Sequence, residues 1–589
     1  MAQLSFADDY NNGEVMTSAQ QPATVHPAFE WIRSQPIDSL NVIVEEYRHK
    51  KTGAVHYHMS ADNNENVFLV ALRTVPHDST GVAHILEHTA LCGSEKYPVR
   101  DPFFMMIRRS LNTFMNAFTS SDWTAYPFAS QNRKDFNNLL DVYLDAVFFS
   151  RLDPLDFAQE GHRVEFAETD NSDSDLVYKG VVFNEMKGAM SSVPSTLWQT
   201  LCKYLYPTNT YHYNSGGEPA DIPDLTYDQL KSFYQSHYHP SNAIFMTYGD
   251  ISATEHHQHF EEKALSRFDA LDNHIHVPTE KRYLAPVRVQ ESYAFDDEGS
   301  GDNKSHIVMG WLLGESADLE AVLKAQLLSS VLLDNSGSPL QRALETTDLA
   351  NAPSPLCGLE ESMREMTFVC GVEGSEHSKV AEVEAMILST LQDVADNGVP
   401  QEQVESVLHQ LELHQREVGG DGYPYGLQLI LSAMGNATHR GDPIAALNID
   451  PVLEQLHQDI KDPAFIKDLA RTLLVDNPHR VTLTMVPDQQ LSSRREAAEA
   501  AQLAAIKATM DDTDKAKVIE LSQALLARQS QQDDESILPK VGLEDVPTEI
   551  PVIEGETETL GDIPLSSYAQ GTNGLVYQQI IIDLPQLDD

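Results

Sequence analysis

Cysteine is scarce in this sequence, and basic residues are far fewer than acidic ones. The 589 residues include four cysteines, none of them paired as C-x-x-C. This scarcity fits a reducing compartment and argues against a disulfide scaffold or a thiolate metal site. Lys and Arg number 40 against 89 Asp and Glu, so the formal net charge is −49. Such a surface repels phosphate backbones and anionic lipids, and we expect no nucleic-acid partner and no membrane surface.

Long apolar runs and a leader pattern are also missing. No apolar stretch approaches the roughly 18 residues needed to span a bilayer. The first 32 residues contain no Lys or Arg, whereas secretory and mitochondrial leaders need basic residues. We therefore expect a cytoplasmic location. The acidity itself suits basic peptide ligands and, equally, solubility or adaptation to salt.

The residues that are present describe a globular protein of several domains. The hydrophobic share is 41% and the charged share 22%, which is ordinary for a chain with large cores. At roughly 150 residues per domain, the length corresponds to about four domains. Hydrophobic periodicity predicts strands and then helices from about residue 40. The strands are expected at 41–47, 54–59 and 67–74, and the helices at 80–92, 101–110, 137–149 and 178–190.

An internal repeat follows these elements. The segments HPSNAIFMTYGD (239–250) and NPHRVTLTMVPD (477–488) each place a proline before a six-residue strand and an aspartate ten residues after that proline. Their offset is 477 − 239 = 238 residues. The same offset moves the strand at 67–74 onto the apolar run 307–313, which precedes a predicted helix at 319–333. We therefore predict two copies of one α/β unit, each of about 230 residues.

The last part of the chain differs in composition. Residues 492–530 are rich in Ala, Glu, Lys and Gln at helical spacing, which predicts a helical hairpin. Residues 531–560 are acidic and interrupted by proline, as in a linker. The segment NGLVYQQIIIDL (573–584) resembles the opening strand of a further unit.

The strongest chemical signal is HILEH, residues 84–88. On a helix, His84 and His88 lie one turn apart on one face, so both imidazoles can reach a single metal ion. Glu87 lies near that face and can contact a water molecule at the metal without being a ligand. The motif follows a predicted strand and a plausible helix start. The alternative is a polar helix face that binds no metal.

A catalytic zinc site needs a third protein ligand. The helical stripe 178, 181, 182, 185, 186, 189 contains Tyr, Val, Val, Glu, Met and Ala, which places Glu185 within an apolar face. An unpaired carboxylate is costly there, and a metal ion would remove the cost. The alternative is a Glu185 that pairs with an Arg or Lys. Weaker ligand candidates are Glu160, Glu165 and Glu168.

HxxEH followed by a distant Glu is the inverted zinc motif, and in these residues the chain resembles the pitrilysin/insulysin family. Within the family it is most similar to the presequence protease group, and the resemblance runs from about residue 28 to the end. The matching stretches are AHILEHTALCGSEKYPVRDPF, SLNTFMNAFTSSDWTAYPFAS, VVFNEMKGAM and YHPSNA. The resemblance implies one Zn²⁺ per chain held by His84, His88 and Glu185. It also implies that Glu87 is the catalytic base that activates a water at the zinc.

The resemblance further implies an α+β (mixed α/β) fold of two homologous domains, each an antiparallel-rich sheet packed with helices, plus a helical hairpin. In the family, two such halves close around an unfolded peptide, and this chain would be the first half. The positions of the motif move by the offset to 322–326, which offer no metal ligand set. The expected parts are a flexible tail (1–24), a catalytic zinc-binding domain (25–275), a connector (276–300), a second, metal-free domain (301–490), a helical hairpin linker (491–550) and the truncated start of a third domain (551–589).

The implied activity is that of a zinc-dependent metalloendopeptidase for short unstructured peptides. Its partners would be those peptides and the C-terminal half of the same protein or a separate chain. The residues Asn116, Ala117 and Phe118 match the family's peptide-binding edge strand. An apolar pocket for the residue after the cut matches Leu91, Phe103, Phe104 and Ile107, although ordinary core packing also explains these four. Two alternatives stay open: a non-catalytic peptide-binding or assembly subunit, and a fragment that binds zinc but needs the C-terminal half for turnover.

Two further features qualify this interpretation. The cluster His256-His257-Gln258-His259 has no carboxylate, and we expect it on a solvent-exposed helix face. Some family members carry a second acidic residue seven positions before the ligand Glu, and this chain has Tyr178 there. The groups that support the metal ligands from behind are therefore an open question.

Overall fold

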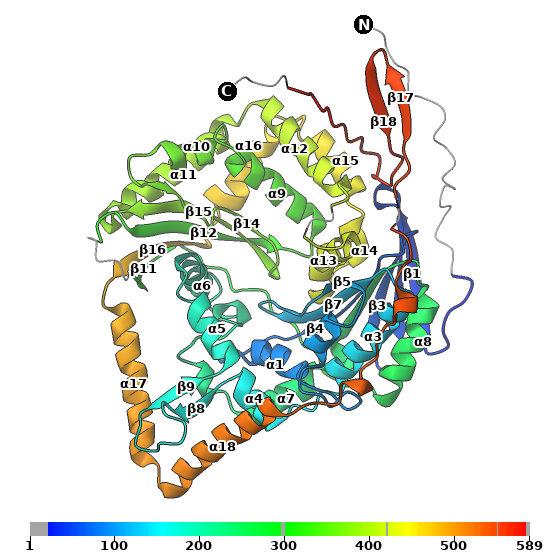
Figure 1. Ribbon diagram of the computed structural model, residues 1–589. Helices are drawn as coiled ribbons and strands as arrows, with labels where there is room; N and C mark the ends of the chain where they lie inside the picture. Colours follow the sequence, from blue (N-terminus) through cyan, green and yellow to red (C-terminus); the bar gives the residue numbers. More distant parts are fainter. Residues whose placement is uncertain (1–21, 296–300, 420–421, 551, 585–589) are drawn as a thin grey trace.

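The protein is described here by a computed structural model that covers residues 22–295, 301–419, 422–550 and 552–584. It is a mixed α/β structure with two large sheets, each packed with helices (Figure 1), as the sequence predicted. Most of the expected flexible tail, residues 1–24, lies outside the described residues. Among the residues covered, no helix combines the length and the apolar character that crossing a membrane requires.

The first sheet has eight strands, and its central strand comes late in the chain. β10 pairs in parallel with β3 and antiparallel with β4, so it lies between two strands that are consecutive in sequence. In spatial order the strands are β1 (Phe29–Ile37), β2 (Val42–His49), β3 (Val55–Ser60), β10 (Ala243–Gly249), β4 (Asn66–Arg73), β7 (Trp123–Ser130) and β5 (Asn112–Met115), with β6 (Phe118–Thr119) also paired to β7.

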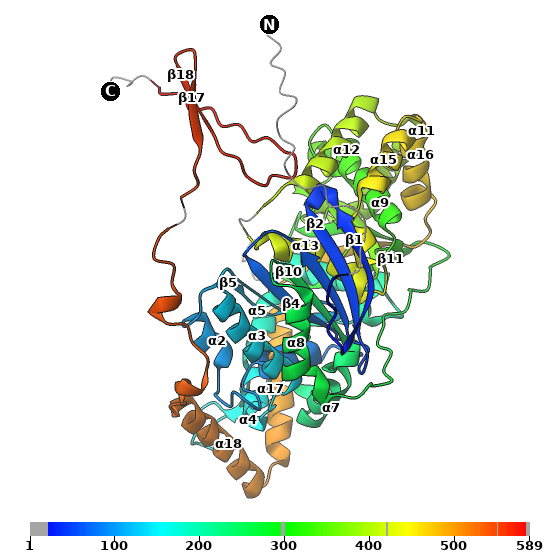
Figure 2. The ribbon, with the colours of Figure 1, turned by 90° about the vertical axis from the view of Figure 1, so that its right-hand side faces the viewer.

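The strand β4 is buried on both faces, which explains its continuous apolar sequence NVFLVALR. Phe68 and Val70 belong to the core that includes α1 (Val82–Ala90) and α3 (Arg133–Phe148). Val67 and Leu69 face the opposite way, into a core completed by α13 (Tyr425–Thr438). Since α13 follows the strands of the second unit in the chain, the two units share this second core (Figure 2).

The second sheet repeats the arrangement of the first. β16 pairs in parallel with β11 and antiparallel with β12, just as β10 does with β3 and β4, so the predicted repeat is confirmed. Its helix α9 (Leu319–Leu333) buries Leu323 and Ala325 in the second core. The strands in spatial order are β11 (Val287–Ala294), β16 (Arg480–Asp488), β12 (Ser305–Glu315), β15 (Glu365–Ser375) and β13 (Ala352–Pro353), with β14 (Gly358–Glu360) also paired to β15.

Two expected boundaries differ in the structure. The connector predicted over 276–300 contains β11, because its alternating sequence VRVQESYA finds a parallel partner in β16. The helix predicted from residue 178 begins at Val181 as α5 (Val181–Ala189). Tyr178 lies instead in β9 (Leu176–Lys179), which pairs with β8 (Arg163–Phe166).

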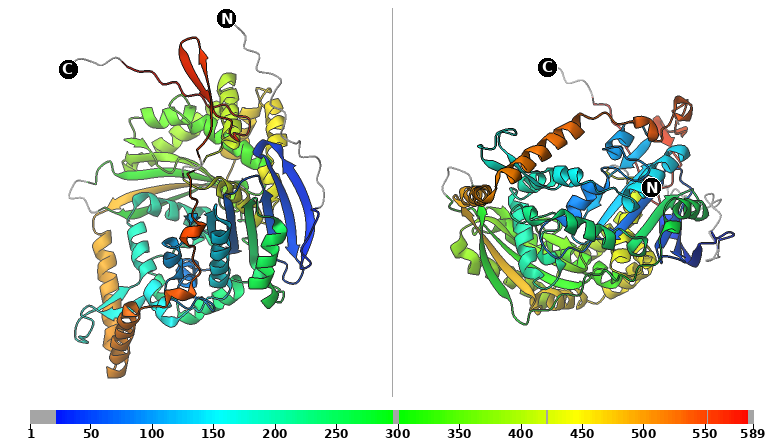
Figure 3. Two further views of the ribbon diagram at one scale, coloured as in Figure 1. Left: turned by 45° about the vertical axis from the view of Figure 1, so that its right-hand side comes forward. Right: turned by 90° about the horizontal axis from the view of Figure 1, so that it is seen from below.

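The predicted helical hairpin is present as α17 (Leu491–Thr509) and α18 (Asp512–Ser530). In Figure 1, α17 runs down the left side and α18 along the bottom, and Figure 3 shows the same hairpin from two further sides. Leu503 packs with Phe166 and Leu176 of the β8–β9 pair. The hairpin therefore leaves the second unit and returns along the first one.

The segment after the hairpin does not form a further packed unit among the described residues. β17 (Glu556–Leu560) and β18 (Ile563–Ser567) pair only with each other, project from the molecule (Figure 2), and are exposed along their whole length. The strand predicted at 573–584 is not formed, because no neighbouring strand is present to pair with it. Its apolar residues Ile580, Ile581 and Ile582 are exposed.

The cluster of histidines on α8 (Ala253–Lys263) is not on a solvated face, as the sequence suggested. His256 and His257 are buried, and His257 Nε2 lies 2.9 Å from His56 Nδ1. His56 Nε2 and His58 Nδ1 each lie 2.8 Å from the Thr247 hydroxyl. Burial lowers the pKa of all four histidines, that of His58 to about 4 and that of His257 to about 2. The prediction was wrong because the partners come from β3 and β10, far away in sequence.

Candidate metal centre

The helix α1 begins at a glycine that its surroundings require. Gly81 has φ of 72°, and a Cβ there would lie 2.7 Å from the carbonyl oxygen of Gly216. Only glycine allows both the left-handed backbone and the close approach of this loop. The loop in turn reaches His84, whose Nδ1 lies 3.1 Å from the same Gly216 oxygen.

The structure brings together the three predicted ligands. Glu185 Oε2 lies 3.7 Å from His84 Nε2 and 3.6 Å from His88 Nε2. In the part of the chain that the structure describes, these residues form the one group of three or more His, Cys, Asp or Glu side chains whose ligand atoms all lie within 4.8 Å of one another. A tetrahedral ion with bonds of about 2.1 Å separates its ligands by about 3.4 Å. The donor set and its spacing fit Zn²⁺.

The two imidazoles are oriented by hydrogen bonds on their far side. His88 Nδ1 lies 3.1 Å from Glu160 Oε2, as His84 Nδ1 does from Gly216 O. Because both Nδ1 atoms donate, each Nε2 keeps its lone pair toward Glu185. Burial lowers the pKa of His88, but the hydrogen bond from Glu160 and the charges of Glu87, Glu160 and Glu185 raise it overall.

Glu185 differs from expectation in its burial. Its side chain is 51% exposed, whereas the neighbouring Val182 and Met186 are buried. The helical stripe placed it among apolar residues, but α5 begins three residues later than predicted and buries a narrower face. The argument from the cost of a buried carboxylate was therefore wrong, although the residue lies beside both histidines.

The position of α5 is fixed by another close backbone contact. A Cβ on Gly180, the residue before α5, would lie 1.9 Å from the carbonyl oxygen of Gly161. Gly161 ends α4 (Pro154–Glu160). The end of α4 and the start of α5 are thus in direct contact, which sets where Glu185 lies relative to α1.

Glu87 contacts a residue that the sequence did not single out. Thr119 in β6 donates a hydrogen bond to Glu87 Oε2. The Thr124 hydroxyl lies 3.4 Å from that of Thr119 and 2.8 Å from that of Thr74. Three threonines from neighbouring strands therefore anchor the carboxylate, and no local pattern in the sequence could have shown it.

The expected peptide-binding edge strand lies at the rim of the first sheet. Among the described strands, β5 and β6 pair only with β7, so their other side has no strand partner. Asn116 is exposed, and Ala117 and Phe118 are half-buried. The ring of Phe118 lies 6.0 Å from that of Tyr423 in the second unit.

The expected apolar pocket residues divide into two pairs. Leu91 and Phe103 are half-buried against the first core. Phe104 is 60% exposed and Ile107 is 41% exposed on α2 (Pro102–Ile107). Core packing therefore accounts for the first pair and not for the second.

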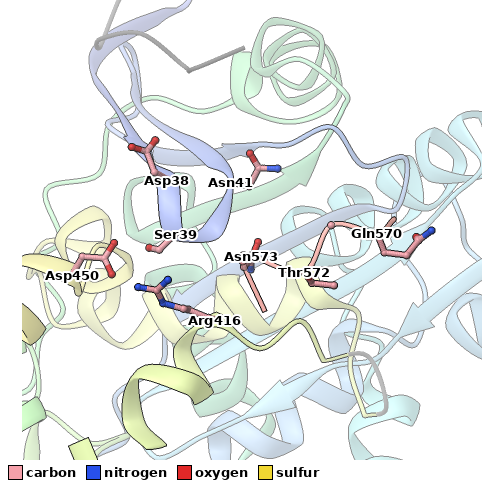
Figure 4. A pocket seen from close by; sticks show the side chains of 10 residues that line it. Asp38, Ser39, Asn41, Arg416, Asp450, Gln570, Thr572 and Asn573 are labelled. Atoms are coloured by element: carbon pink, nitrogen blue, oxygen red, sulfur yellow. The ribbon is translucent and has the colours of Figure 1, made fainter. Parts of the chain in front are cut away.

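A pocket of about 590 Å³ lies elsewhere, where residues 570–574 pass the turn at Asp38–Asn41 (Figure 4). Arg416 and Asp450 of the second unit complete its lining. None of the candidate metal ligands lines it, and its position gives no support for the chemistry at α1.

Three family models match the chain. "Insulinase (Peptidase family M16)" matches residues 73–192, which include all three candidate ligands. "Peptidase M16 inactive domain" matches 224–411, and "Peptidase M16C associated" matches 485–589.

Curated relatives cover nearly the whole chain. It is 39% identical to the mitochondrial presequence protease of Xenopus tropicalis, over 94% of this chain and 54% of that protein. It is 34% identical to presequence protease 1 of Arabidopsis thaliana, described as chloroplastic/mitochondrial, over 97% of this chain and 54% of that protein. The chain thus spans about half the length of the curated relatives it matches.

Solved structures share the fold. A protease from Helicobacter pylori superimposes with a TM-score of 0.57 at 16% identity, over 75% of this chain and 99% of that one. Pitrilysin gives a TM-score of 0.54 at 16% identity, over 79% of this chain and 47% of that one.

The names of the relatives correct one prediction. A cytoplasmic location was inferred from the acidic first residues, and it is wrong: the relatives are mitochondrial or chloroplastic proteins. The composition of the first 32 residues is therefore no guide to the compartment.

Proposed function

Because the chain belongs to the M16 peptidase family, that of pitrilysin and insulysin, we propose that it is the metal-bearing part of a zinc-dependent endopeptidase. Its substrates would be short unstructured peptides, enclosed between this chain and a second half. One observation carries the proposal: three ligand atoms from α1 and α5 converge within 4.8 Å, with both histidines already oriented.

In this proposal the chain's own residues divide the work. His84, His88 and Glu185 would hold one Zn²⁺, which when bound supplies a Lewis acid that polarises the scissile carbonyl and makes water more acidic. Glu87 would accept a proton from the attacking water and pass it to the leaving amine as the C–N bond breaks. The products are a carboxylate and an amine, so atoms and protons balance.

Peptide binding would use the free edge next to the metal centre. An extended peptide can add to β6 through main-chain hydrogen bonds, since no described strand pairs with that side. Such binding reads backbone shape more than side-chain identity, which suits a broad range of peptides. Phe104 and Ile107 would offer apolar surface to the residue after the cut.

The length comparison favours a division of labour within the whole enzyme. The chain covers 54% of its relative from Xenopus tropicalis, and enclosing a peptide needs a second wall. We therefore propose that the chain holds the metal and the base, and that turnover depends on a further half. A purely peptide-binding role is disfavoured because the complete ligand set and Glu87 are all present.

Metal analysis of variants tests the proposal. The purified chain should bind about one zinc per molecule. Glu87→Gln should keep the zinc and abolish hydrolysis, whereas His84→Ala and Glu185→Ala should lose it. Loss of zinc from Glu87→Gln as readily as from His84→Ala would contradict the assignment of base and ligands.

A further inference from the structure

Glu160 connects the metal centre to a helix that carries none of the ligands. It is the last residue of α4, and its side chain is only 12% exposed. One carboxylate oxygen lies 3.1 Å from His88 Nδ1, and the other accepts a hydrogen bond of 2.9 Å from the Gln159 amide. Both oxygens are therefore held, one of them by a metal ligand.

The linker helix α18 grips α4 at the same place. Gln529 donates from its side-chain amide to Gln159 Oε1 at 3.2 Å. Side-chain hydrogen bonds thus run without a break from Gln529 through Gln159 and Glu160 to His88. About 370 residues separate the first two members in sequence.

Arg528, next to Gln529, holds α4 more strongly. Its guanidinium lies 2.6 Å and 2.7 Å from the two oxygens of Asp156 and 3.1 Å from Asp153, the N-cap residue of α4. The Asp156 side chain is only 5% exposed, so this pair is shielded from water. Charge-assisted bonds of this kind are stronger than neutral ones and fix geometry.

The helix α4 also supports the third ligand. Its terminal Gly161 is in close contact with Gly180, where α5 begins. A shift of α4 would therefore move Glu160 away from His88 and also displace the start of the helix that carries Glu185. The whole ligand set depends on the position of α4.

We propose that Glu160 is a positioning residue for the metal ligand His88, and that the linker helix α18 controls the affinity of the centre for zinc by holding α4 through Arg528 and Gln529. This inference rests on the proposed zinc site. Docking of the linker onto the first unit thereby becomes a condition for tight metal binding.

Competition for zinc with a chromogenic chelator tests this inference on the full 589-residue chain without any need for peptidase activity. Glu160→Gln keeps size and an acceptor oxygen but removes the charge, and it should raise the zinc Kd by about 10- to 100-fold. Arg528→Met should raise the Kd by about 2- to 30-fold, the range for groups that act through a neighbour. Gln529→Leu lies on an exposed part of α18, so folding is not at risk, and it should change the Kd in the same direction.

The matched control is Lys507→Met. Lys507 also ties the linker to the first unit, through bonds of 2.8 Å and 2.6 Å to the carbonyl oxygens of Asp173 and Ser174, but it does not contact α4. Its zinc Kd should stay within about twofold of the unsubstituted chain. An unchanged Kd in Glu160→Gln, or equal effects of Arg528→Met and Lys507→Met, would overturn the inference. An unsubstituted chain that binds no zinc would instead overturn the proposed function.

Discussion

Thr119 donates a hydrogen bond to the carboxylate of Glu87, although 32 residues separate the two in sequence. Thr119 lies in β6, the strand along which we propose that peptides bind. The proposed base is therefore held by the strand that would receive the substrate. A peptide that orders β6 would also fix the carboxylate in place.

The hydroxyl of Thr119 should matter for turnover more than for binding. Thr119→Val keeps the shape of the side chain but removes the donor, and it should lower kcat by about tenfold because the base is less well positioned. Thr119→Ser should restore most of the rate. Steady-state assays on an unstructured peptide should show a small change in KM, and zinc content should not change. A Thr119→Ser variant as slow as Thr119→Val would show that packing, not the hydroxyl, is responsible.

Arg73 should hold the two units together. Its buried guanidinium donates to the carbonyl oxygens of Ala437 and Thr438, each at 2.7 Å, at the end of α13. Burial lowers the pKa of Arg73 to about 10, so it stays charged at neutral pH. Arg73→Met should cost on the order of 3 kcal/mol of unfolding free energy, because a charged bond is worth about 1.5–3 kcal/mol. Urea unfolding measures this cost, and a loss under about 0.5 kcal/mol, typical of a neutral surface change, would contradict it.

The buried histidines should make the fold sensitive to acid. Folding lowers the pKa of His58 from its ordinary value to about 4, so below pH 6.5 the unfolded chain binds more protons than the folded one. The stabilising effect is present above pH 6.5 and is lost as the pH falls toward 4. Each such histidine should cost about 2 kcal/mol at pH 5. Thermal unfolding recorded from pH 7.5 to 4.5 measures the trend.

A pair of variants separates this effect from general acid denaturation. His58→Asn removes one titrating group but keeps a polar atom near Thr247, so its stability should fall less steeply with acid. His377→Asn changes an exposed histidine and should leave the slope as it is. Identical slopes for both variants would rule out His58 as a source of acid sensitivity.

The chain by itself should be a poor peptidase despite an intact metal site. Groups aimed at the developing oxyanion are worth about 10²–10³ in rate each, and we expect the missing half to supply them. An assay on an unstructured peptide, with and without a separately produced second half, measures the gain. Full activity from the isolated chain would show that its own residues complete the site.

The local patterns in the sequence predicted most of the fold. Prolines and aspartates around the strands at 243–249 and 480–488 gave the repeat, because both strands sit at the same place in their sheets. The HILEH spacing placed His84 and His88 on one helix face, because that depends only on helical geometry. These features are local or recur at a fixed offset, so one chain suffices to see them.

Features that depend on distant contacts escaped. The burial of His256 and His257 requires His56 and Thr247 from other strands. Glu160 was only one of several acidic candidates, because nothing near it in sequence indicates His88 as its partner. The exposure of Glu185 depends on where α5 begins, and that is set by the contact of Gly180 with Gly161.

The late arrival of β10 has a consequence for how the chain is made. While the ribosome is still adding residues before 243, β3 and β4 lack the strand that separates them in the finished sheet. The nascent chain must therefore keep their unpaired edges from other partners until the centre strand emerges, and non-local pairing of this kind is slow. HILEH is translated early, yet its helix has no completed sheet to rest on until about 160 residues later, since β10 begins at Ala243. A chaperone that protects strand edges should bind stalled chains that end before residue 243 and release those that extend past 270.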